Sequence, residues 1–394
     1  MTRAAAVEVS WAQVHAFRLE RHHLLERAPR RQLTRVAGEI CGAQAQVMSA
    51  AELQLAVRAA CSVGDVRRAL LTDRTLVKTW LMRGTLHIVP AADLPLFTAA
   101  LSTKWMSPRP SWLKWFHMDQ AEWDDLAESI GGVLGSEPMT RDELVTRLAK
   151  GRSKRVAQYL RGGWGSLLKP AAYRGLLCFG PSRGTSVTFV RPKNWLHAWR
   201  AVDPDEALAE VARRYLRAYG PATKQDFARW FAPSFGGVAA AGWSGIASEL
   251  MTVSVDGTPM QMLTREVKAL TAVRATRSVQ LLPGFDPYLM GHLSRDHLFE
   301  RVHRWKVSRV AGWISAVVLV DGRVEGTWTH ARSADALVVT VVPLERMPRR
   351  ARGEIEARAA ELATALGLAT AEVRVAGQAI RSTTGASPQR RSSR

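Results

Sequence analysis

The feature that most constrains the fold of this chain is a helix-entrance pattern that occurs twice. Pro138–Leu144 (PMTRDEL) and Pro221–Phe227 (PATKQDF) each place a proline, a small or apolar residue, a threonine, an acid three residues after the threonine, and a hydrophobe. A threonine followed by an acid at this spacing is typical of a helix N-terminus. Each copy precedes a pair of segments with strand character. This internal repeat predicts tandem units, each made of helices followed by a two-stranded wing.

An earlier segment repeats this order of elements and forms a first unit. Ser49 and Glu52 have the spacing of a capping box, which predicts a helix entrance at Ser49. Arg83 and Gly84 separate two segments of strand character and indicate the tip of a wing hairpin. The predicted elements of this unit are helices over Leu33–Cys41, from Ser49 and from Gly64, and strands over Thr75–Met82 and Thr85–Val89.

The second and third units contain the two copies of the repeat. In the second we expect a capping box of Thr140 and Glu143, and in the third a cap at Thr223. The elements predicted in the second unit are a helix over Trp164–Tyr173 and strands over Leu176–Phe179 and Ser186–Arg191. Those predicted in the third are a helix over Asp205–Tyr219 and strands over Met251–Val255 and Met260–Leu263, which flank the hairpin signal Asp256-Gly257.

Strand signals dominate the rest of the chain. Asp321-Gly322 marks another hairpin, between Trp313–Val320 and Arg323–His330, and a strand at Val338–Val342 precedes a helix over Arg352–Leu366. We therefore predict an α+β fold of three tandem winged-helix units and a C-terminal β-rich, barrel-like module. The expected bounds are 10–117, 118–200 and 201–265 for the winged helices, 266–375 for the module, and 376–394 for a basic disordered tail.

The charge of the chain indicates a polyanionic partner. The 55 Lys and Arg residues outnumber the 35 Asp and Glu residues, which gives a formal net charge of +20. Arginine supplies most of this charge, and its planar guanidinium matches phosphate oxygens. Anionic membrane is the competing polyanion, but the sequence contains no amphipathic basic anchor. The charge therefore favours nucleic acid.

Several classes of protein are disfavoured by the sequence. Cys41, Cys61 and Cys178 are far apart and lack metal-ligand spacing, which argues against a structural zinc or a disulfide framework. Met1–Ser10 lacks the apolar stretch of a signal peptide, and the apolar run Ile314–Val320 is too short to span a bilayer. We expect a monomeric cytoplasmic protein associated with the nucleoid.

One short element between two predicted helices could carry chemistry. In Gln44-Ala45-Gln46, an extended or turn-like backbone would point both amides to the same side, whereas in a helix they would diverge by roughly 200°. Spacing alone is a weak signal, because two nearby glutamines are usually surface residues. The pair gains significance only from its context in the chain.

Three segments, in order, resemble the bacterial winged-helix DNA glycosylases, the AlkZ-like family linked to azinomycin resistance, with YcaQ-type proteins as more distant relatives. Cys41–Ala50 (CGAQAQVMSA) resembles the catalytic Gln-hydrophobe-Gln region, Thr79–His87 (TWLMRGTLH) the wing, and Leu281–Leu289 (LLPGFDPYL) a marker before the β module. The resemblance covers roughly residues 10–345. YcaQ-type proteins have Asp at the second motif position, so Gln46 places this chain nearer the crosslink-resistance branch. Ala45 is a small occupant of the hydrophobic position.

The resemblance implies a monofunctional DNA glycosylase that removes N7-alkylguanine and other N-alkylated purines from double-stranded DNA. Some members unhook interstrand crosslinks and confer self-resistance to alkylating antibiotics. Glutamine cannot act as a general base, but an N7-alkylated guanine is already cationic and leaves readily. The task left to Gln44 and Gln46 is then to position water and stabilise positive charge on the sugar.

Other residues are weaker candidates, each with a structural alternative. Arg83 and His87, on and beside the first wing, are expected to contact DNA, although His87 equally suits a buried core. Lys104, Arg109 and Lys114 alternate with tryptophans, a pattern that fits a DNA channel or helix packing. Asp286, between two prolines, is expected to stabilise a turn rather than to act as a catalytic acid.

The sequence predicts no cofactor and no metal. It lacks a phosphate loop, a dinucleotide fingerprint and a nucleophile elbow, and no nucleotide cofactor is expected. His292, His297 and His303 lack a metal-ligand spacing. Two other functions remain open from the residues: a non-enzymatic winged-helix DNA-binding or regulatory protein, and a protein that sequesters the free drug in an apolar pocket.

Overall fold

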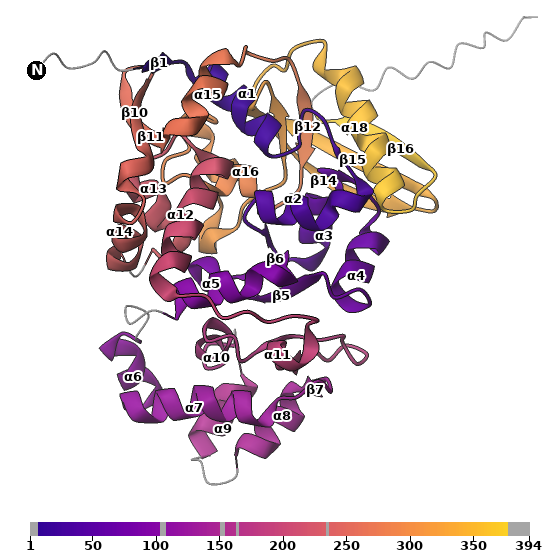
Figure 1. Cartoon of the computed structure of the whole chain (residues 1–394). Helices are drawn as coiled ribbons and strands as arrows, with labels where there is room; N and C mark the ends of the chain where they lie inside the picture. Colours follow the sequence, from indigo (N-terminus) through magenta and orange to yellow (C-terminus); the bar gives the residue numbers. More distant parts are fainter. Residues whose placement is uncertain (1–6, 103–107, 150–153, 163–164, 234–235, 377–394) are drawn as a thin grey trace, which may run out of the picture.

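The structure is a computed structural model that describes residues 7–102, 108–149, 154–162, 165–233 and 236–376, and Figure 1 shows how their elements are arranged. Helices and strands are mixed along the chain, which confirms the predicted α+β class. Three sheets of three strands and one sheet of five strands form within the described ranges, beside a short parallel pair of β2 (Ala28–Pro29) and β4 (Ala59–Ala60).

The first unit contains the predicted pair of strands. β5 (Leu76–Trp80) and β6 (Leu86–Pro90) are antiparallel, and β3 (Ala43–Gln44) adds to the other edge of β6. The helices of this unit are α2 (Leu33–Glu39), α3 (Met48–Ala56), α4 (Val63–Leu71) and α5 (Leu94–Leu101). The entrance near Gly64 is confirmed, because Ser62 and Asp65 form a capping box at the start of α4.

The predicted capping box at Ser49 is wrong. Helix α3 begins at Met48, its N-cap residue is Val47, and no side chain caps it. Glu52 is buried inside the helix, where its carboxylate accepts two hydrogen bonds from Arg67 of α4, at 2.7 and 2.9 Å. The acid therefore ties two helices together instead of capping one of them.

The second unit forms the lower part of the molecule in Figure 1. Its sheet has the order β7-β9-β8, with β7 (Met139–Thr140), β8 (Cys178–Phe179) and β9 (Thr188–Val190). The Thr140–Glu143 capping box is confirmed. The helix predicted from Trp164 begins later, at Lys169, and Trp164 itself lies outside the described residues. The helices are α6 (Pro110–Phe116), α7 (Gln120–Val133), α8 (Arg141–Leu148), α9 (Lys154–Arg161), α10 (Lys169–Tyr173) and α11 (Pro192–Trp195).

The third unit is built on α12 (Pro204–Tyr219), α13 (Lys224–Phe231) and α14 (Gly236–Ser244). Thr223 and Asp226 cap α13 as predicted, and β10 (Leu250–Val255) and β11 (Thr258–Leu263) form the predicted hairpin. One pairing is not contained in the sequence predictions: β1 (Val7–Val9) runs parallel to β10. The N-terminal strand and the following α1 (Trp11–Arg21) thus pack with the third unit, and α15 (Val267–Ala272) contacts α1.

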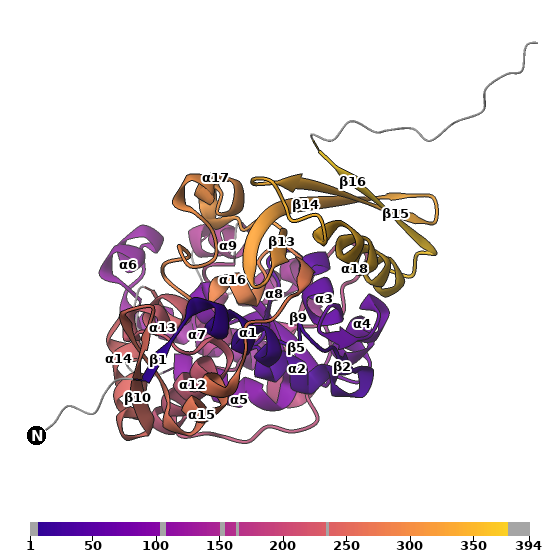
Figure 2. The same cartoon turned by 90° about the horizontal axis from the view of Figure 1, so that it is seen from above.

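The C-terminal module is a curled sheet of five strands in sequential order, backed by a helix (Figure 2). Its strands are β12 (Val279–Leu282), β13 (Val317–Val320), β14 (Arg323–Ser333), β15 (Ala336–Pro343) and β16 (Thr370–Val375). Helix α18 (Ala351–Ala365) contacts both edge strands, β12 and β16. Within the described ranges these edge strands do not pair with each other, so the expected barrel-like module is an open sheet. Short helices α16 (Pro287–Met290) and α17 (Arg304–Val307) lie between β12 and β13.

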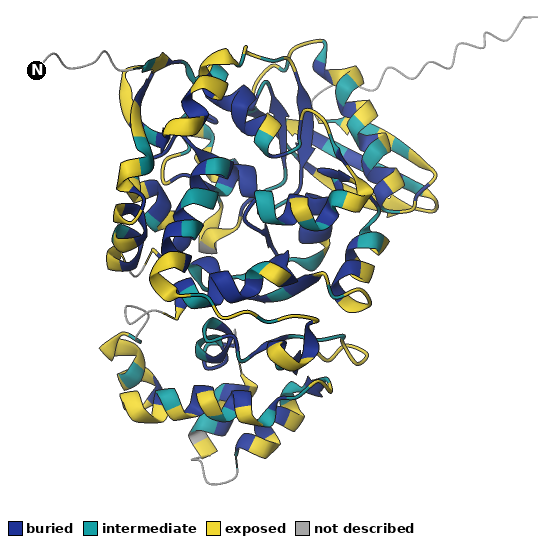
Figure 3. Cartoon of the chain, viewed as in Figure 1, coloured by how far each residue is buried: buried dark blue, intermediate teal, exposed yellow. Residues whose placement is uncertain are grey.

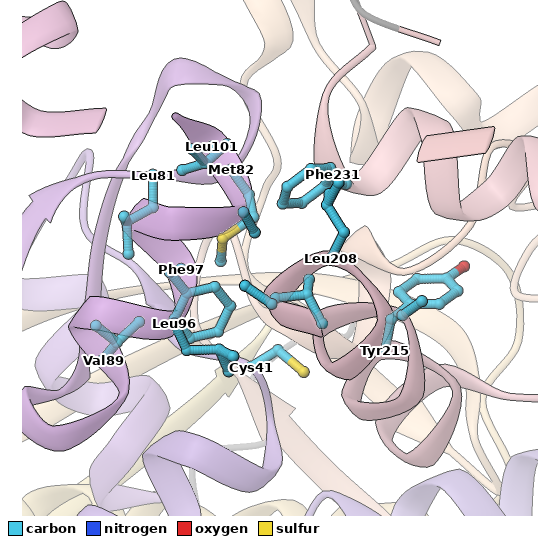
Figure 4. Packing of buried hydrophobic residues seen from close by; sticks show 14 of the residues in the cluster. Cys41, Leu81, Met82, Val89, Leu96, Phe97, Leu101, Leu208, Tyr215 and Phe231 are labelled. Carbon is cyan, nitrogen blue, oxygen red and sulfur yellow. The ribbon is translucent and has the colours of Figure 1, made fainter. Parts of the chain in front are cut away.

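The units share apolar cores rather than standing apart. Figure 4 shows Met82, Phe97 and Cys41 of the first unit packed against Leu208, Tyr215 and Phe231 of the third. Figure 3 shows that the elements around this contact are mostly buried, whereas the lower helices carry an exposed outer face. The β5–β6 hairpin is therefore enclosed between units, which brings its tip to the motif described next.

Candidate active site

The Gln44-Ala45-Gln46 segment leaves strand β3 after Gln44 and bends at Gln46, so it is not helical, as the paired-site interpretation requires. Gln44 is the last residue of β3 and lies opposite His87 of β6. The small Ala45 side chain is buried in the core of the first unit. Gln44 is only 5% exposed, whereas Gln46 is exposed. Both side chains reach the β5–β6 hairpin, although they differ in burial.

Arg83 holds the Gln44 amide. Its Nη2 donates to Gln44 Oε1 at 3.0 Å and lies 3.2 Å from Nε2 of His87. Its Nη1 donates to the backbone carbonyl of Trp230 in α13, at 2.7 Å. The backbone of Arg83 is left-handed, with φ of 58°, a conformation that non-glycine residues seldom adopt. One guanidinium thus joins the motif, the hairpin and the third unit.

The orientations of both amides follow from the chemistry of their partners. The guanidinium of Arg83 is a donor only, so the oxygen of the Gln44 amide must face it. The backbone N–H of Leu86 donates to Gln46 Oε1 at 2.8 Å, which fixes the second amide in the same way. Within the described residues neither –NH2 group donates to the protein. Two amide donors therefore remain for a ligand, together with the second lone pair of each oxygen.

His87 is neutral and acts as an acceptor for Arg83. Burial is the main cause that lowers the pKa of His87 to about 3, and the positive charge of Arg83 adds to the shift. Its Nδ1–H donates to the carbonyl of Thr85 at 3.0 Å, so Nε2 carries the lone pair that faces Arg83. Burial also lowers the pKa of Arg83 to about 10, which leaves the guanidinium charged at neutral pH.

Uncompensated positive charge surrounds this site. Arg295 and Arg229 both lie near enough to Arg83 to lower its pKa, and burial lowers the pKa of Arg295 itself to about 10. Arg295 donates to the Leu289 carbonyl and to Ser308 Oγ, at 2.6 and 3.1 Å. Within the described part of the chain, neither Arg83 nor Arg295 forms an ion pair with a carboxylate. Like charges without acidic partners fit a site that receives an anion.

A buried chain of polar contacts supports the motif from behind. Asp286 pairs with Arg58 through two hydrogen bonds of 2.7 and 2.9 Å, and both side chains are 0% exposed. Arg58 also donates to the carbonyl of Gln54, whose Nε2 donates to the backbone carbonyls of Gln44 and Gly284, at 3.3 and 2.9 Å. Asp286 caps α16 by accepting from the N–H of Tyr288. The turn-stabilising interpretation of Asp286 is thereby confirmed.

The structure brings together only some of the residues predicted to contact DNA. Arg83 and His87 meet at Gln44, and the tip of their hairpin is enclosed against α10 and α13. Arg109 and Lys114 are exposed on and beside α6 in the second unit, away from the motif in Figures 1 and 2. Lys104 lies outside the described residues. The sequence did not reveal Gln54, Arg58, Trp230 or Arg295, because their contacts join distant segments.

The described residues offer no further chemistry beside this site. No group of three His, Cys, Asp or Glu side chains in these ranges is arranged to hold a metal ion. No helix within them has the length and apolar character needed to cross a membrane. Burial raises the pKa of Cys41 to about 12 and that of Cys61 to about 11, so these thiols are unreactive at neutral pH.

The chain is basic and has helical units with β-hairpins. Its two fixed amides lie beside arginines that form no ion pair within the described residues. These features fit a DNA-acting protein of the glycosylase class. The family model for AlkZ-like DNA glycosylases matches residues 37–365, and the chain belongs to this family. It is 40% identical over 378 residues to the interstrand DNA cross-link repair glycosylase of Streptomyces sahachiroi, covering 94% of this chain and 100% of that one. The solved structure of the Streptomyces sahachiroi DNA glycosylase AlkZ matches with a TM-score of 0.84 at 38% identity, over 94% of this chain and 100% of that chain.

Proposed function

We propose that this DNA glycosylase hydrolyses the N-glycosidic bond of N7-alkylguanine-type bases in duplex DNA, with Gln44 and Gln46 as its catalytic residues. The observation that carries the proposal is the pair of amides, each held in a fixed orientation by a hydrogen bond to its oxygen. Preorganised dipoles lower a barrier because they need no reorganisation as charge develops. No titratable group is required, since alkylation has already made the base a cationic leaving group.

The fixed amides suggest how water is held. Each amide oxygen keeps one lone pair that can accept a water proton, while each –NH2 can donate to the water oxygen or to an acceptor on DNA. A water held between the amides would present its remaining lone pair to the sugar carbon. Bases of undamaged DNA lack the cationic charge, and we expect no release from them.

Arg83 limits where DNA can lie. A buried cation beside the sugar would oppose the positive charge that develops there, unless a phosphate neutralises the guanidinium. We therefore place a DNA phosphate against Arg83 and Arg295, with His87 acting through Arg83 rather than by direct contact, because its ring is only 2% exposed. Arg109 and Lys114 are proposed to contact more distant phosphates from the second unit, and Lys104 is proposed to contact DNA as well.

We infer that the three units with three-stranded sheets are winged helices centred on 10–117, 118–200 and 201–265, and that 266–375 form the β module. Two elements cross these bounds, since α6 packs with the second unit and β1 pairs with the third. The protein is proposed to act as a monomer on alkylated duplex DNA at the nucleoid. The Streptomyces sahachiroi relative is a crosslink-repair glycosylase by name, which supports interstrand crosslinks as a second substrate. Unhooking of a crosslinked duplex on a denaturing gel tests this second substrate separately from monoadducts.

Release of 7-methylguanine from methylated duplex DNA tests the catalytic assignment. We expect Gln44→Ala and Gln46→Ala each to lower the single-turnover rate at least tenfold, about 1.4 kcal/mol of barrier. Gln120→Ala, on the exposed face of α7, is the matched control and should leave the rate unchanged. Rates within threefold of the wild type for both motif variants would contradict the assignment.

A further inference from the structure

A segment before β13 combines positive charge with apolar side chains. Residues 301–313, here called the basic-aromatic segment, contain four Lys or Arg residues and no Asp or Glu. Its large apolar side chains include two tryptophans, and its cations are Arg301, Arg304, Lys306 and Arg309. Neither the family resemblance nor the motif analysis gives this segment a role.

The apolar side chains of the segment face solvent. Trp305 is 69% exposed and Val310 is 92% exposed, and the side chains of Val302 and Trp313 are exposed as well. Exposed apolar residues are ordinary when they are scattered, but a cluster of them within one short segment marks an interaction surface. The cations between them exclude a purely apolar partner.

The segment has a defined conformation. Arg309 N–H donates to the carbonyl of Trp313 at 2.8 Å, and Ser315 Oγ donates to the carbonyl of Lys306 at 2.8 Å. The ring of Trp313 meets the buried Phe285 edge to face, with centroids 5.0 Å apart. The exposed side chains are therefore presented from a braced loop that contains α17.

Two separate series of residue contacts connect this segment to the candidate active site. Phe285, which Trp313 contacts, follows Gly284, and the carbonyl of Gly284 accepts from the same Gln54 amide that donates to the carbonyl of Gln44. Arg295 forms the second route, because it donates to Ser308 of the segment and lies close to Arg83. In Figure 2, α17 projects at the margin of the molecule, where a long partner could pass.

We propose that the basic-aromatic segment is a DNA-binding element that contacts the duplex beside the lesion. Arg304 and Arg309 bind backbone phosphates, while Trp305 and Val310 pack against sugars or bases. Charge identifies DNA as the partner of this segment. A second copy of the chain would bring the same cations against those of the segment and repel it, because the chain as a whole carries a net charge of +20. The proposal rests on the DNA glycosylase activity and is independent of the catalytic role of Gln44 and Gln46.

The charged and apolar contributions can be separated by salt dependence. Affinity for an undamaged 25-base-pair duplex is measured by fluorescence anisotropy over a range of salt concentrations. In Arg304→Ala/Arg309→Ala the slope of log K against log salt should fall in magnitude by roughly 1.8, because two phosphate contacts are lost. Trp305→Ala should weaken binding about tenfold at every salt concentration and leave this slope unchanged.

A matched pair of exposed arginines supplies the control. Arg352→Ala/Arg374→Ala, on α18 and β16, removes the same charge from another surface and should leave affinity and slope near the wild-type values. Equal effects in both double variants would overturn the proposal, since net charge alone would then explain binding. Unchanged affinity in Arg304→Ala/Arg309→Ala and in Trp305→Ala would overturn it as well.

Two further measurements distinguish DNA binding by this segment from membrane binding and from the catalytic role of Gln44 and Gln46. If Trp305→Ala keeps its DNA affinity but loses binding to phosphatidylserine vesicles, the segment serves a membrane instead, and the proposal fails. Gln44→Ala should keep the wild-type salt slope on the undamaged duplex while releasing 7-methylguanine at least tenfold more slowly than the wild type. A failure of the catalytic assignment thus appears in release rates alone, and a failure of the segment in affinities alone.

Discussion

Arg83 combines two features that cost free energy at a single residue. A left-handed backbone at a non-glycine residue costs roughly 1–2 kcal/mol. Burial of its guanidinium without a carboxylate partner removes a charge from water and adds to that cost. Both costs are offset only by hydrogen bonds to Gln44, His87 and Trp230. Strain and uncompensated charge at the same residue point to a functional demand.

Substitution of Arg83 tests its positioning of Gln44. We expect Arg83→Met to lower the single-turnover rate of 7-methylguanine release by about tenfold or more, because the Gln44 amide loses the donor that orients it. Arg83→Lys should restore part of the rate, since an ammonium reaches one acceptor but not three. Arg352→Met is the surface control. A change confined to KM in both Arg83 variants would show that Arg83 binds DNA without positioning the amide.

At the scale of residues, the sequence predicted the Gln44-Ala45-Gln46 motif but not the side chains that hold it in place. The Gln44 and Gln46 pair could be predicted from the sequence because residues i and i+2 of an extended segment lie on one side. Nothing local to Gln54 or Arg58 marks them, since their partners Gly284 and Asp286 are more than two hundred residues away in the chain. Contacts of this kind depend on tertiary packing, which local patterns do not encode.

At the scale of elements, the buried pair of Arg58 and Asp286 fastens helix α3 to the turn that begins α16. Arg58 follows the end of α3, and the same guanidinium holds the carbonyl of Gln54 on the last turn of that helix. Both side chains are fully buried, so each charge depends on the other for neutralisation. The position of β3 and its motif therefore depends on a contact between the first unit and the C-terminal module.

Asp286→Asn separates a structural from a catalytic role of this carboxylate. Asparagine keeps the helix cap but leaves Arg58 charged and buried, and we expect the free energy of unfolding in urea to fall by about 3–5 kcal/mol. Glu356→Gln, in an exposed i,i+4 pair with Arg352, should change it little because solvent screens that pair. A fully stable Asp286→Asn that releases no base would instead assign the carboxylate to catalysis.

Helix entrances show which local signals were reliable. The threonine caps at Thr140 and Thr223 form as predicted, because each acid three residues on returns to the cap backbone. The spacing at Ser49 and Glu52 is the same, yet Arg67 of α4 takes the carboxylate of Glu52. An ion pair alone does not break a capping box, because Glu143 pairs with Arg183 and still caps α8. The box at Ser49 fails because α3 already begins at Met48, so Ser49 lies inside the helix.

At the scale of the whole molecule, the order of units was predictable and their mutual packing was not. Helix–hairpin succession is a local property, whereas the enclosure of the Arg83 hairpin depends on apolar surfaces of three units meeting. The pairing of β1 with β10 likewise joins the chain's start to its third unit. One consequence is that several histidines, spread over the sequence, become buried in the folded protein.

This buried set predicts loss of stability in mild acid. Burial is the main cause that lowers the pKa of His15, His87 and His292 to about 3, and it holds the pKa of His22 well below its usual value. Charges nearby modify these shifts: Arg18, Arg58, Arg83 and Arg323 add to them, and Asp226 opposes the shift at His292. As pH falls below about 6.5, these histidines in the unfolded chain bind protons before those in the folded protein.

The stability that these neutral rings contribute is therefore complete above pH 6.5 and declines as the pH falls toward 3. Each ring removes up to about 1.4 kcal/mol per pH unit in this interval. Urea unfolding at pH 7.5, 6.5 and 5.5 should show a plateau and then a steep fall, before carboxylates begin to titrate. His15→Gln should reduce the decline in the free energy of unfolding between pH 6.5 and 5.5 by the contribution of one histidine, whatever its effect at pH 7.5. His117→Gln, at an exposed position, is the control and should leave this decline unchanged. A stability that stays constant down to pH 5.5 would contradict a neutral, buried histidine set, because proton binding to the unfolded chain alone requires the decline.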